Sequence, residues 1–217
     1  MKKIMFNDKF LLTDAVEAEK KTMTRRIVHL SQHNADILMG KIPTCPQSIV
    51  DAIWFESRYK IGEVVAVAQN YKSINDFYEI AYKRYNSFHG QIVTKYDISF
   101  KEIVKWFELR ESLKDTAGWT NKMFVKADLM PHHIKITGIK VERLQDISDE
   151  DCLKEGIIHA YTNNDGIKIY YTPHTKRGYL STDVAQQAFA FLIDKVSGKG
   201  TWESNPFVFA YEFVLVD

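Results

Sequence analysis

Hydrophobic positions along the chain change between strand-like and helix-like spacing. Apolar residues at 4–6 predict a short opening strand, and Thr13 offers an N-cap for a short helix that ends at a run of basic residues. The unbroken apolar run 64–68 predicts a strand that is buried on both faces. Residues 134–141 alternate as a strand, and Gly138 shifts the phase of this alternation as a bulge or bend would.

Two segments in the middle of the chain carry clearer helix boundaries. Ser99 with Glu102 matches a capping box, and the helix that follows has apolar residues at 100, 103, 104 and 107. Ser148 begins a short helix, and Gly156 provides a stop for it.

The last third of the chain predicts a hairpin, a helix and a strand. Residues 159–182 contain Asn163-Asn164-Asp165-Gly166 between two tyrosine-containing runs, which favours a hairpin. Asp183 with Gln186 begins a further helix that Gly198 closes. Residues 207–216 predict a long strand that is apolar on both faces, and therefore a central one. These elements predict one α+β domain over 1–217 with two insertions.

Aromatic residues are concentrated between about residue 71 and residue 119. At helical spacing, such residues favour a packed core over a platform for stacking nucleic-acid bases. The aromatic positions are Tyr71, Phe77, Tyr78, Tyr82, Tyr85, Phe88, Tyr96, Phe100, Trp106, Phe107 and Trp119.

Composition excludes several classes of protein. The 217 residues are 45% hydrophobic and 26% charged with a formal net charge of +1, so nucleic-acid contact would depend on a local basic patch. Cys45 and Cys152 have no metal-ligand or redox spacing, and His132 and His133 would point to opposite faces of an extended segment. We therefore expect no metal and no cofactor. Without a signal peptide or an apolar run of ~20 residues, we expect a cytoplasmic protein with no membrane contact.

The most distinctive feature is a basic run with interspersed hydroxyl groups. Like charges this close repel one another, so the run predicts a nearby phosphate or carboxylate. The alternative is an ordinary basic helix end that interacts with the helix dipole. The run is Lys20-Lys21-Thr22-Met23-Thr24-Arg25-Arg26.

Lys21 and Thr24 form a candidate base and nucleophile. A threonine hydroxyl becomes nucleophilic only when a base takes its proton, and lysine can act as that base when burial or neighbouring cations lower its pKa. Glu155, beside Gly156 at the end of its short helix, is a candidate carboxylate that would orient the ammonium or protonate a leaving amine. The alternative for Glu155 is a solvated helix end.

The basic run closely resembles the Gly-Arg-Lys-Thr-x-Thr-x-Arg signature of ASCH domains, which are small β-barrels related to the PUA fold. Residues 61–67, 141–156 and 202–206 are similar to further elements of that family, the last of them to its longer, phage-associated branch. The resemblance covers a core of about 1–30, 60–70, 123–157 and 184–217. It implies a PUA-like β-barrel with short flanking helices, interrupted by insertions at about 72–121 and 159–183.

The resemblance also implies a function. The ASCH fold is associated with RNA or nucleotide binding, and one small bacterial branch hydrolyses the acetyl amide of N4-acetylcytidine with a lysine, a threonine and a glutamate. Motif matching carries these three roles to Lys21, Thr24 and Glu155, with ligand contacts from Lys20, Thr22, Arg25 and Arg26. The signature's leading Gly-Arg is Glu19-Lys20 here. Arg25 stands where that branch has an apolar residue, and this extra cation favours a phosphorylated ligand.

Three functions follow from these observations. The first is a module that binds RNA or a nucleotide through the basic run. The second is an amidohydrolase of acylated nucleosides. The third is a partner-binding protein of a mobile genetic element, with the aromatic insertion as its interface.

Overall fold

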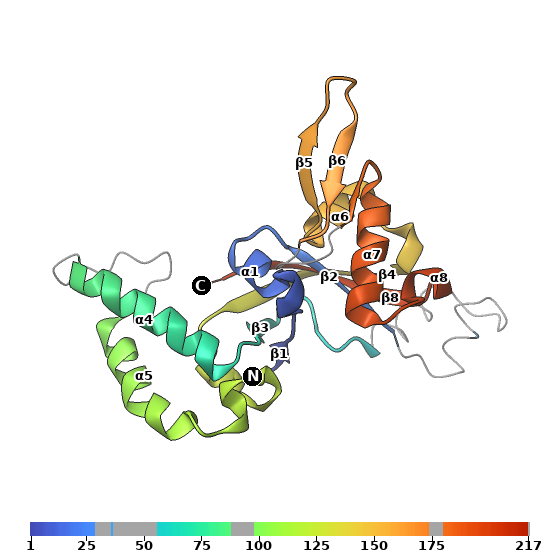
Figure 1. Ribbon diagram of the computed structural model, residues 1–217. Coiled ribbons are helices and arrows are strands. Elements are labelled where there is room, and N and C mark those ends of the chain that lie inside the picture. The colour runs from blue at the N-terminus through green and yellow to red at the C-terminus, as the bar shows by residue number, and fades with distance from the viewer. Residues whose placement is uncertain (29–35, 37–55, 88–97, 174–179, 217) are drawn as a thin grey trace. The chain divides into compact units, whose positions relative to one another are not determined.

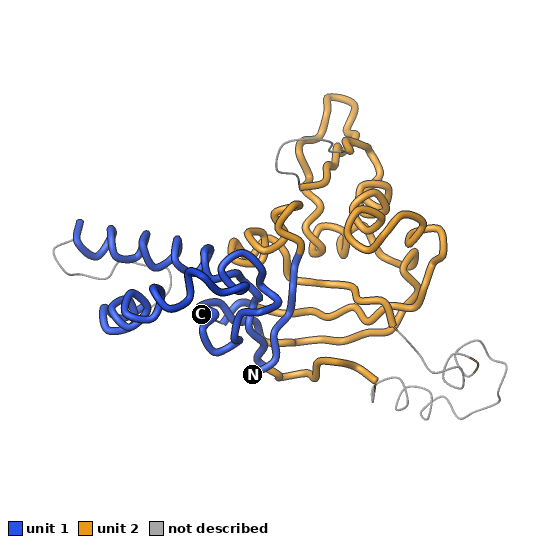
Figure 2. The backbone as a smooth tube through the Cα atoms, turned by 60° about the horizontal axis from the view of Figure 1, so that its bottom comes forward, with its two compact units in different colours: residues 1–6, 64–134, 215–217 blue, residues 7–63, 135–214 orange. Residues whose placement is uncertain are grey.

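The computed structural model describes residues 1–28, 36, 56–87, 98–173 and 180–216 (Figure 1). These residues form two compact units (Figure 2): unit 1 comprises 1–6, 64–134 and 215–217, and unit 2 comprises 7–63 and 135–214. Cys45, Phe88 and Tyr96 lie outside the described residues.

The strands form two sheets. One sheet has five strands in the order β1-β3-β4-β8-β2 and is mixed, since β1 is parallel to β3 and β2 is antiparallel to β8. The other is the antiparallel sheet β5-β6-β7. The strands are β1 Lys3–Ile4, β2 Met23–Ile27, β3 Val64–Val67, β4 His133–Arg143, β5 Ile158–Thr162, β6 Lys168–Tyr171, β7 Ser181–Thr182 and β8 Phe207–Leu215.

Helices accompany both sheets, so the predicted α+β class is confirmed. Among the described residues no closed barrel is present, and the barrel implied by the ASCH resemblance stays a prediction. The α-helices are α1 Leu12–Glu17, α4 Tyr71–Ser87, α5 Phe100–Leu113, α6 Asp149–Lys154, α7 Ala185–Ser197 and α8 Thr201–Ser204. The 3-10 helices are η1 Asp8–Phe10, η2 Ala117–Trp119, η3 Lys122–Phe124, η4 Ala127–Leu129 and η5 Leu144–Asp146.

Unit 1 has an aromatic core between β3 and the antiparallel pair α4 and α5. Tyr71 and Trp106 are buried in it, and the rings of Tyr78 and Trp106 stack at 5.3 Å. Tyr82 and Phe100 lie at more exposed positions, where their rings contact Phe107 and Tyr85 at 5.4 and 4.5 Å. Stacked aromatic pairs stabilise a core by about 0.5–1.5 kcal/mol beyond their buried area, which explains why this region is rich in such residues.

Unit 2 is organised around β8. This strand lies between β4 and β2, and the residues from Val208 to Tyr211 are all buried. A strand that pairs on both edges and packs on both faces must be apolar throughout, which is the pattern of its sequence. Helices α6 and α7 lie on one face of this sheet, and β5 and β6 extend from α6 as the predicted hairpin (Figure 1).

Several helix boundaries agree with the sequence pattern. Ser99 and Glu102 form the capping box of α5, and the Ser148 hydroxyl accepts a hydrogen bond from Asp151 N at 3.1 Å at the start of α6. After α6, Gly156 has φ +104°, a conformation that glycine adopts without the strain of a Cβ. Gly198 ends α7 in the same region of φ.

The predicted N-cap at Thr13 is wrong, and the helix predicted from Asp183 begins two residues later, at Ala185. Thr13 lies inside α1, where its hydroxyl donates to the Asp8 carboxylate at 2.5 Å, and the N-cap residue is Leu11. Asp183 does not cap α7. The chain instead begins that helix after Val184, whose backbone N–H donates to the Thr182 hydroxyl at 3.3 Å. In both places a threonine hydroxyl forms a local hydrogen bond that differs from the one expected of an N-cap.

Gly138 lies within β4, which continues through it without a break. A Cβ at this position would lie 2.9 Å from Oε2 of Glu212 on β8, so a larger residue would require that carboxylate to shift. Within the described part of the chain, each helix is too short or too polar to cross a membrane.

A buried ion cluster as the candidate functional site

The predicted basic run forms a strand in place of a basic helix end. Helix α1 ends before it, and the backbone N–H groups of Lys20 and Lys21 both donate to Ala15 O. The chain then enters β2, whose partner is β8 in the register Met23↔Glu212. The backbone of Thr22 fixes this entry, since it donates to Lys154 O and accepts from Phe213 N, each at 2.9 Å.

Lys21 and Glu155 meet in the interior of unit 2. Lys21 Nζ lies 2.6 Å from Glu155 Oε2 and also donates to the Glu155 backbone oxygen at 2.6 Å. The two side chains are only 2% and 6% exposed. Removing two charges from water is costly unless they pair, so their close contact is what allows both groups to be buried.

Arg25 contacts three carboxylates at once. Its Nε and Nη2 donate to Glu142 Oε1 at 2.9 and 2.5 Å, Nη2 also donates to Asp151 Oδ2 at 2.9 Å, and Nη1 donates to Glu155 Oε1 at 3.2 Å. The Arg25 side chain is 0% exposed. The negative charge expected beside the basic run is therefore supplied by the protein itself. It comes from Glu142 on β4, Asp151 on α6 and Glu155 directly after α6.

Lys140 completes this set at the surface. Its ammonium lies 2.5 Å from Asp151 Oδ2 and 3.4 Å from Glu142 Oε2, and its side chain is 46% exposed. We call these six residues the ion cluster: Lys21, Arg25, Lys140, Glu142, Asp151 and Glu155. Its three cations and three carboxylates balance, so its formal charge is zero.

Burial and charge act in opposite directions on the groups of the ion cluster. Burial lowers the pKa of Lys21, and Glu155 opposes this effect, while Arg26 and Arg25 lower the pKa further by repulsion. Burial alone would lower the pKa of Arg25, but Glu155 and Glu142 outweigh it and raise this pKa. Lys21 is therefore the cation of the cluster that is closest to losing its proton, which a general base requires.

Thr24 lies on the other face of β2. Neighbouring residues of a strand point to opposite faces, so Thr24 points away from Arg25 and shares a face with its register partner Tyr211. The Thr24 side chain is buried, and no hydrogen bond links its hydroxyl to Lys21 or Glu155 in the described structure. Of the three residues predicted for catalysis, the structure brings two into contact.

A second set of residues lies on the face of Thr24. The rings of Tyr59 and Tyr211 pack edge to face at 5.2 Å, and the Ser57 hydroxyl lies 3.0 Å from the Tyr211 hydroxyl. Arg26 points to this face, where burial lowers its pKa and Arg58 lowers it further by repulsion. Arg58 lies at an exposed position with its guanidinium 5.7 Å from the Tyr59 ring centre. We call Arg26, Arg58, Tyr59 and Tyr211 the arginine–tyrosine face.

The other predicted ligand contacts are placed as follows. Lys20 lies at an exposed position directly before the buried Lys21, and Thr22 is half-buried at the entry to β2. Six residues of the ion cluster and the arginine–tyrosine face were not proposed as site residues from sequence: Lys140, Glu142, Asp151, Arg58, Tyr59 and Tyr211. The sequence does show the acidic run Asp149-Glu150-Asp151. Acidic residues are favoured in the first turn of any helix, and this ordinary explanation concealed that Asp151 points inward.

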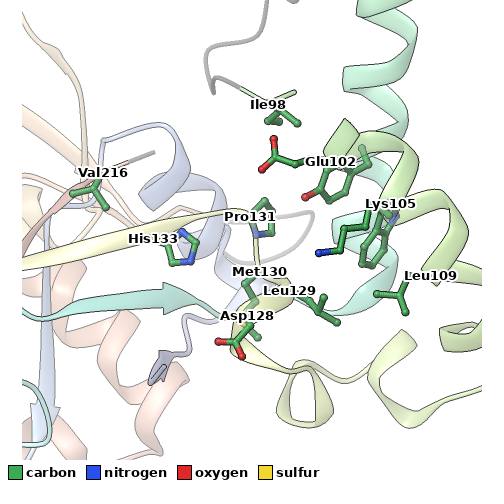
Figure 3. Close-up of a pocket in the computed structure, with 12 residues that line it drawn as sticks. Ile98, Glu102, Lys105, Leu109, Asp128, Leu129, Met130, Pro131, His133 and Val216 are labelled. Atoms are coloured by element: carbon green, nitrogen blue, oxygen red, sulfur yellow. The ribbon is translucent and has the colours of Figure 1, made fainter. Parts of the chain in front are cut away.

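A separate hollow lies within unit 1 (Figure 3). It has a volume of about 510 Å³ and is bounded by α5 on one side and by the segment 128–133 on another. Glu102 and Lys105 lie on the α5 side, and Pro131 and His133 lie on the side of the segment. No residue of the ion cluster lines it.

Searching the described residues finds no group of three or more His, Cys, Asp and Glu side chains that is arranged to hold a metal ion. No protein-family model, no curated protein and no solved structure matches the chain. The geometry of unit 2 is therefore the basis for the functional proposal.

Proposed function

We propose that this protein is an ASCH-like, PUA-like domain that binds RNA or a nucleotide in unit 2. The phosphate would lie on the arginine–tyrosine face, and the base would have to pass the outer edge of β2 to reach Lys21 and Glu155, which are buried on the opposite face. The observation that carries this proposal is that Arg26 and Arg58 lie close enough to repel each other, beside two tyrosine rings.

An anionic ligand relieves the repulsion between two guanidinium groups, and each guanidinium offers a planar fork that fits a phosphate. Tyr59 and Tyr211 are only 3% and 1% exposed, so their rings support the two arginines from inside the unit and do not stack on bases. Lys20, at an exposed position on the chain that leads into β2, adds a further cation in the same unit. The ion cluster is a weaker phosphate site because its charges already balance.

Fluorescence anisotropy with a labelled single-stranded RNA oligomer tests the proposal from about 50 to 200 mM salt. Affinity is expected to fall as salt increases, and Arg58→Gln should weaken binding and reduce the slope against log salt by about 1. Arg84→Gln is the control, because Arg84 lies at an exposed position of α4 in unit 1. RNA binding that ignores salt and is unchanged by Arg58→Gln would refute the proposal.

A second candidate is the amidohydrolase of acylated nucleosides, and one observation favours it. Lys21 Nζ lies 2.6 Å from Glu155 Oε2, and the pKa of Lys21 is lowered by burial. In this reaction Lys21 must be neutral and Thr24 must first turn toward it, since no hydrogen bond joins the two side chains in the described structure. Thr24 Oγ1 then attacks the acyl carbon and passes its proton to Lys21. The acyl C–N bond breaks as the amine takes this proton from Lys21 with the assistance of Glu155, and water hydrolyses the acyl–threonine ester.

Incubation with N4-acetylcytidine, followed by chromatography for released cytidine, tests this candidate. Thr24→Ala should abolish release, and Thr137→Ala on the exposed side of β4 is the matched control. Cytidine release that survives Thr24→Ala would remove the assignment of the nucleophile, and no release from the unaltered protein would remove this substrate.

A further inference from the structure

Arg25 is buried where a ligand cannot contact it directly. Its guanidinium lies under α6 and α7, 6.0 Å from the Phe189 ring centre, and its side chain is 0% exposed. The nitrogen atoms Nε, Nη1 and Nη2 all donate to carboxylates that come from β4, α6 and the residue after α6. A phosphate could reach Arg25 only by displacing one of these carboxylates from a buried position.

The contacts around Glu155 show what this arrangement does. Its Oε1 accepts from Arg25 Nη1 at 3.2 Å and its Oε2 accepts from Lys21 Nζ at 2.6 Å. Both carboxylate oxygens are thus held from different sides, which fixes the plane of the group. Because Arg25 is itself bound to Glu142 and Asp151, its Nη1 is held at one position relative to Glu155.

We propose that Arg25 is a positioning residue, which holds the Glu155 carboxylate in place for Lys21 and is not touched by the ligand. Glu142 and Asp151 act with it as anchors for the guanidinium. Lys140 contributes to this positioning, because its ammonium also pairs with Asp151 and Glu142. It thereby weakens the attraction of these two carboxylates for Arg25, which would otherwise draw the guanidinium away from Glu155. This role deepens the proposed function, and it rests on the Lys21–Glu155 pair being part of the ligand site.

A substitution that keeps the charge separates positioning from simple charge. Arg25→Lys retains the positive charge, but an ammonium is a point charge and lacks the fork that reaches three carboxylates. The substituted lysine would stay with Glu142 and Asp151 and leave Glu155 to Lys21 alone. The pKa of Lys21 would then rise, because its ammonium faces an unshared carboxylate and less repulsion. Arg26, the other cation that acts on Lys21, is unchanged.

The readout is the Lys21 pKa in the full chain, measured by NMR titration of ¹³Cε-labelled lysine and assigned with Lys21→Met. Arg25→Lys and Arg25→Gln are both expected to raise it, and Arg143→Lys is the control for an arginine-to-lysine change in the same unit. An Arg25→Lys protein with an unchanged or lower Lys21 pKa would overturn the proposal, since charge alone would then explain the site.

A milder variant covers the case in which a substitution at Arg25 prevents folding. Lys140 lies at a surface position, and Lys140→Gln should raise the Lys21 pKa because Glu142 and Asp151 would then draw Arg25 more strongly away from Glu155, while Lys140→Arg should keep the original value. A Lys140→Gln protein whose Lys21 pKa stays at the original value would also count against the proposal.

Salt dependence of RNA binding gives an independent test. If Arg25 does not meet the phosphate, Arg25→Lys leaves the slope of affinity against log salt unchanged, whereas Arg58→Gln lowers it by about 1. A slope that falls by about 1 with Arg25→Gln would overturn the positioning role. If no RNA binds to the unaltered protein, the proposed function fails, and the NMR titration still decides the role of Arg25.

Discussion

Replacing Glu155 with glutamine tests whether the ion cluster is a buried, mutually dependent set of charges. The substitution keeps the shape of the side chain but removes the charge that faces Lys21 at 2.6 Å and Arg25 at 3.2 Å. Arg25 retains Glu142 and Asp151, whereas Lys21 loses its carboxylate partner in a position where it is 2% exposed. Leaving one buried charge unpaired costs about 3–5 kcal/mol, so we expect Glu155→Gln to lower the free energy of unfolding by about that amount at pH 7.

The same variant should show a distinct pH dependence. Glu155 raises the pKa of Lys21 against the effect of burial, so removing it lowers that pKa further below the ordinary value of 10.5. Between the folded and unfolded pKa values the unfolded chain binds more protons, and stability therefore increases with pH. The deficit of Glu155→Gln relative to the unaltered protein should shrink as the pH is raised from 7 toward 10.

Urea unfolding at several pH values measures this effect. Glu150→Gln on the same helix is the matched control, because Glu150 is 78% exposed and its loss should change stability by less than about 0.5 kcal/mol. Adding Lys21→Met to Glu155→Gln removes the unpaired charge and should restore part of the loss. A deficit below about 1 kcal/mol, or one that grows with pH, would refute the view that Lys21 is a charged group dependent on Glu155.

Three further predictions concern other parts of the chain. Burial first, and then Asp14, raise the pKa of Glu17 to about 7, so its stabilising effect is present below pH 4.5 and is lost as the pH rises through 7. Glu17→Gln should therefore add about 1–2 kcal/mol at pH 8 and nothing at pH 4 in urea titrations, and equal gains at both pH values would contradict this. Gly118→Ala would push a Cβ into the Tyr71 ring, so thermal unfolding should show a loss of about 1–3 kcal/mol. Lys3 donates to three backbone carbonyls of 122–125 at 2.7–3.0 Å, so Lys3→Met should cost about 1–3 kcal/mol and speed hydrogen exchange in that segment.

Local patterns predicted the elements of the fold well where one residue decides the backbone. The capping box of α5 and the glycine after α6 need only neighbours in sequence, and both are present as expected. The N-cap at Thr13 failed because its hydroxyl found the Asp8 carboxylate, a partner that a search for N-cap residues does not consider. Closure of a sheet into a barrel depends on pairings between distant strands, and local periodicity carries no information about it.

The candidate site, like the fold, was predicted only in part from the sequence. The sequence pointed to Lys21 and Glu155, and the structure brings them together across 134 positions of chain. It did not indicate that Arg25 would point inward while Thr24 pointed to the opposite face, because that follows from the phase of β2 in its pairing with β8. Glu142 and Asp151 were missed as partners of Arg25 for a related reason. Acidic residues in a helix first turn and at a strand end are usually solvated, and only the three-dimensional packing turns them inward.

The central place of β8 affects how the chain can reach this structure. Met23 on β2 pairs with Glu212 on β8, so β2 must await a partner that leaves the ribosome 189 residues later. Until then the nascent chain carries an open strand edge together with the ammonium and guanidinium groups that later face Glu155. Pairings this distant in sequence slow folding and prolong exposure of unpaired strands. We therefore expect assembly of unit 2 to be a late, post-synthetic event that benefits from chaperone protection.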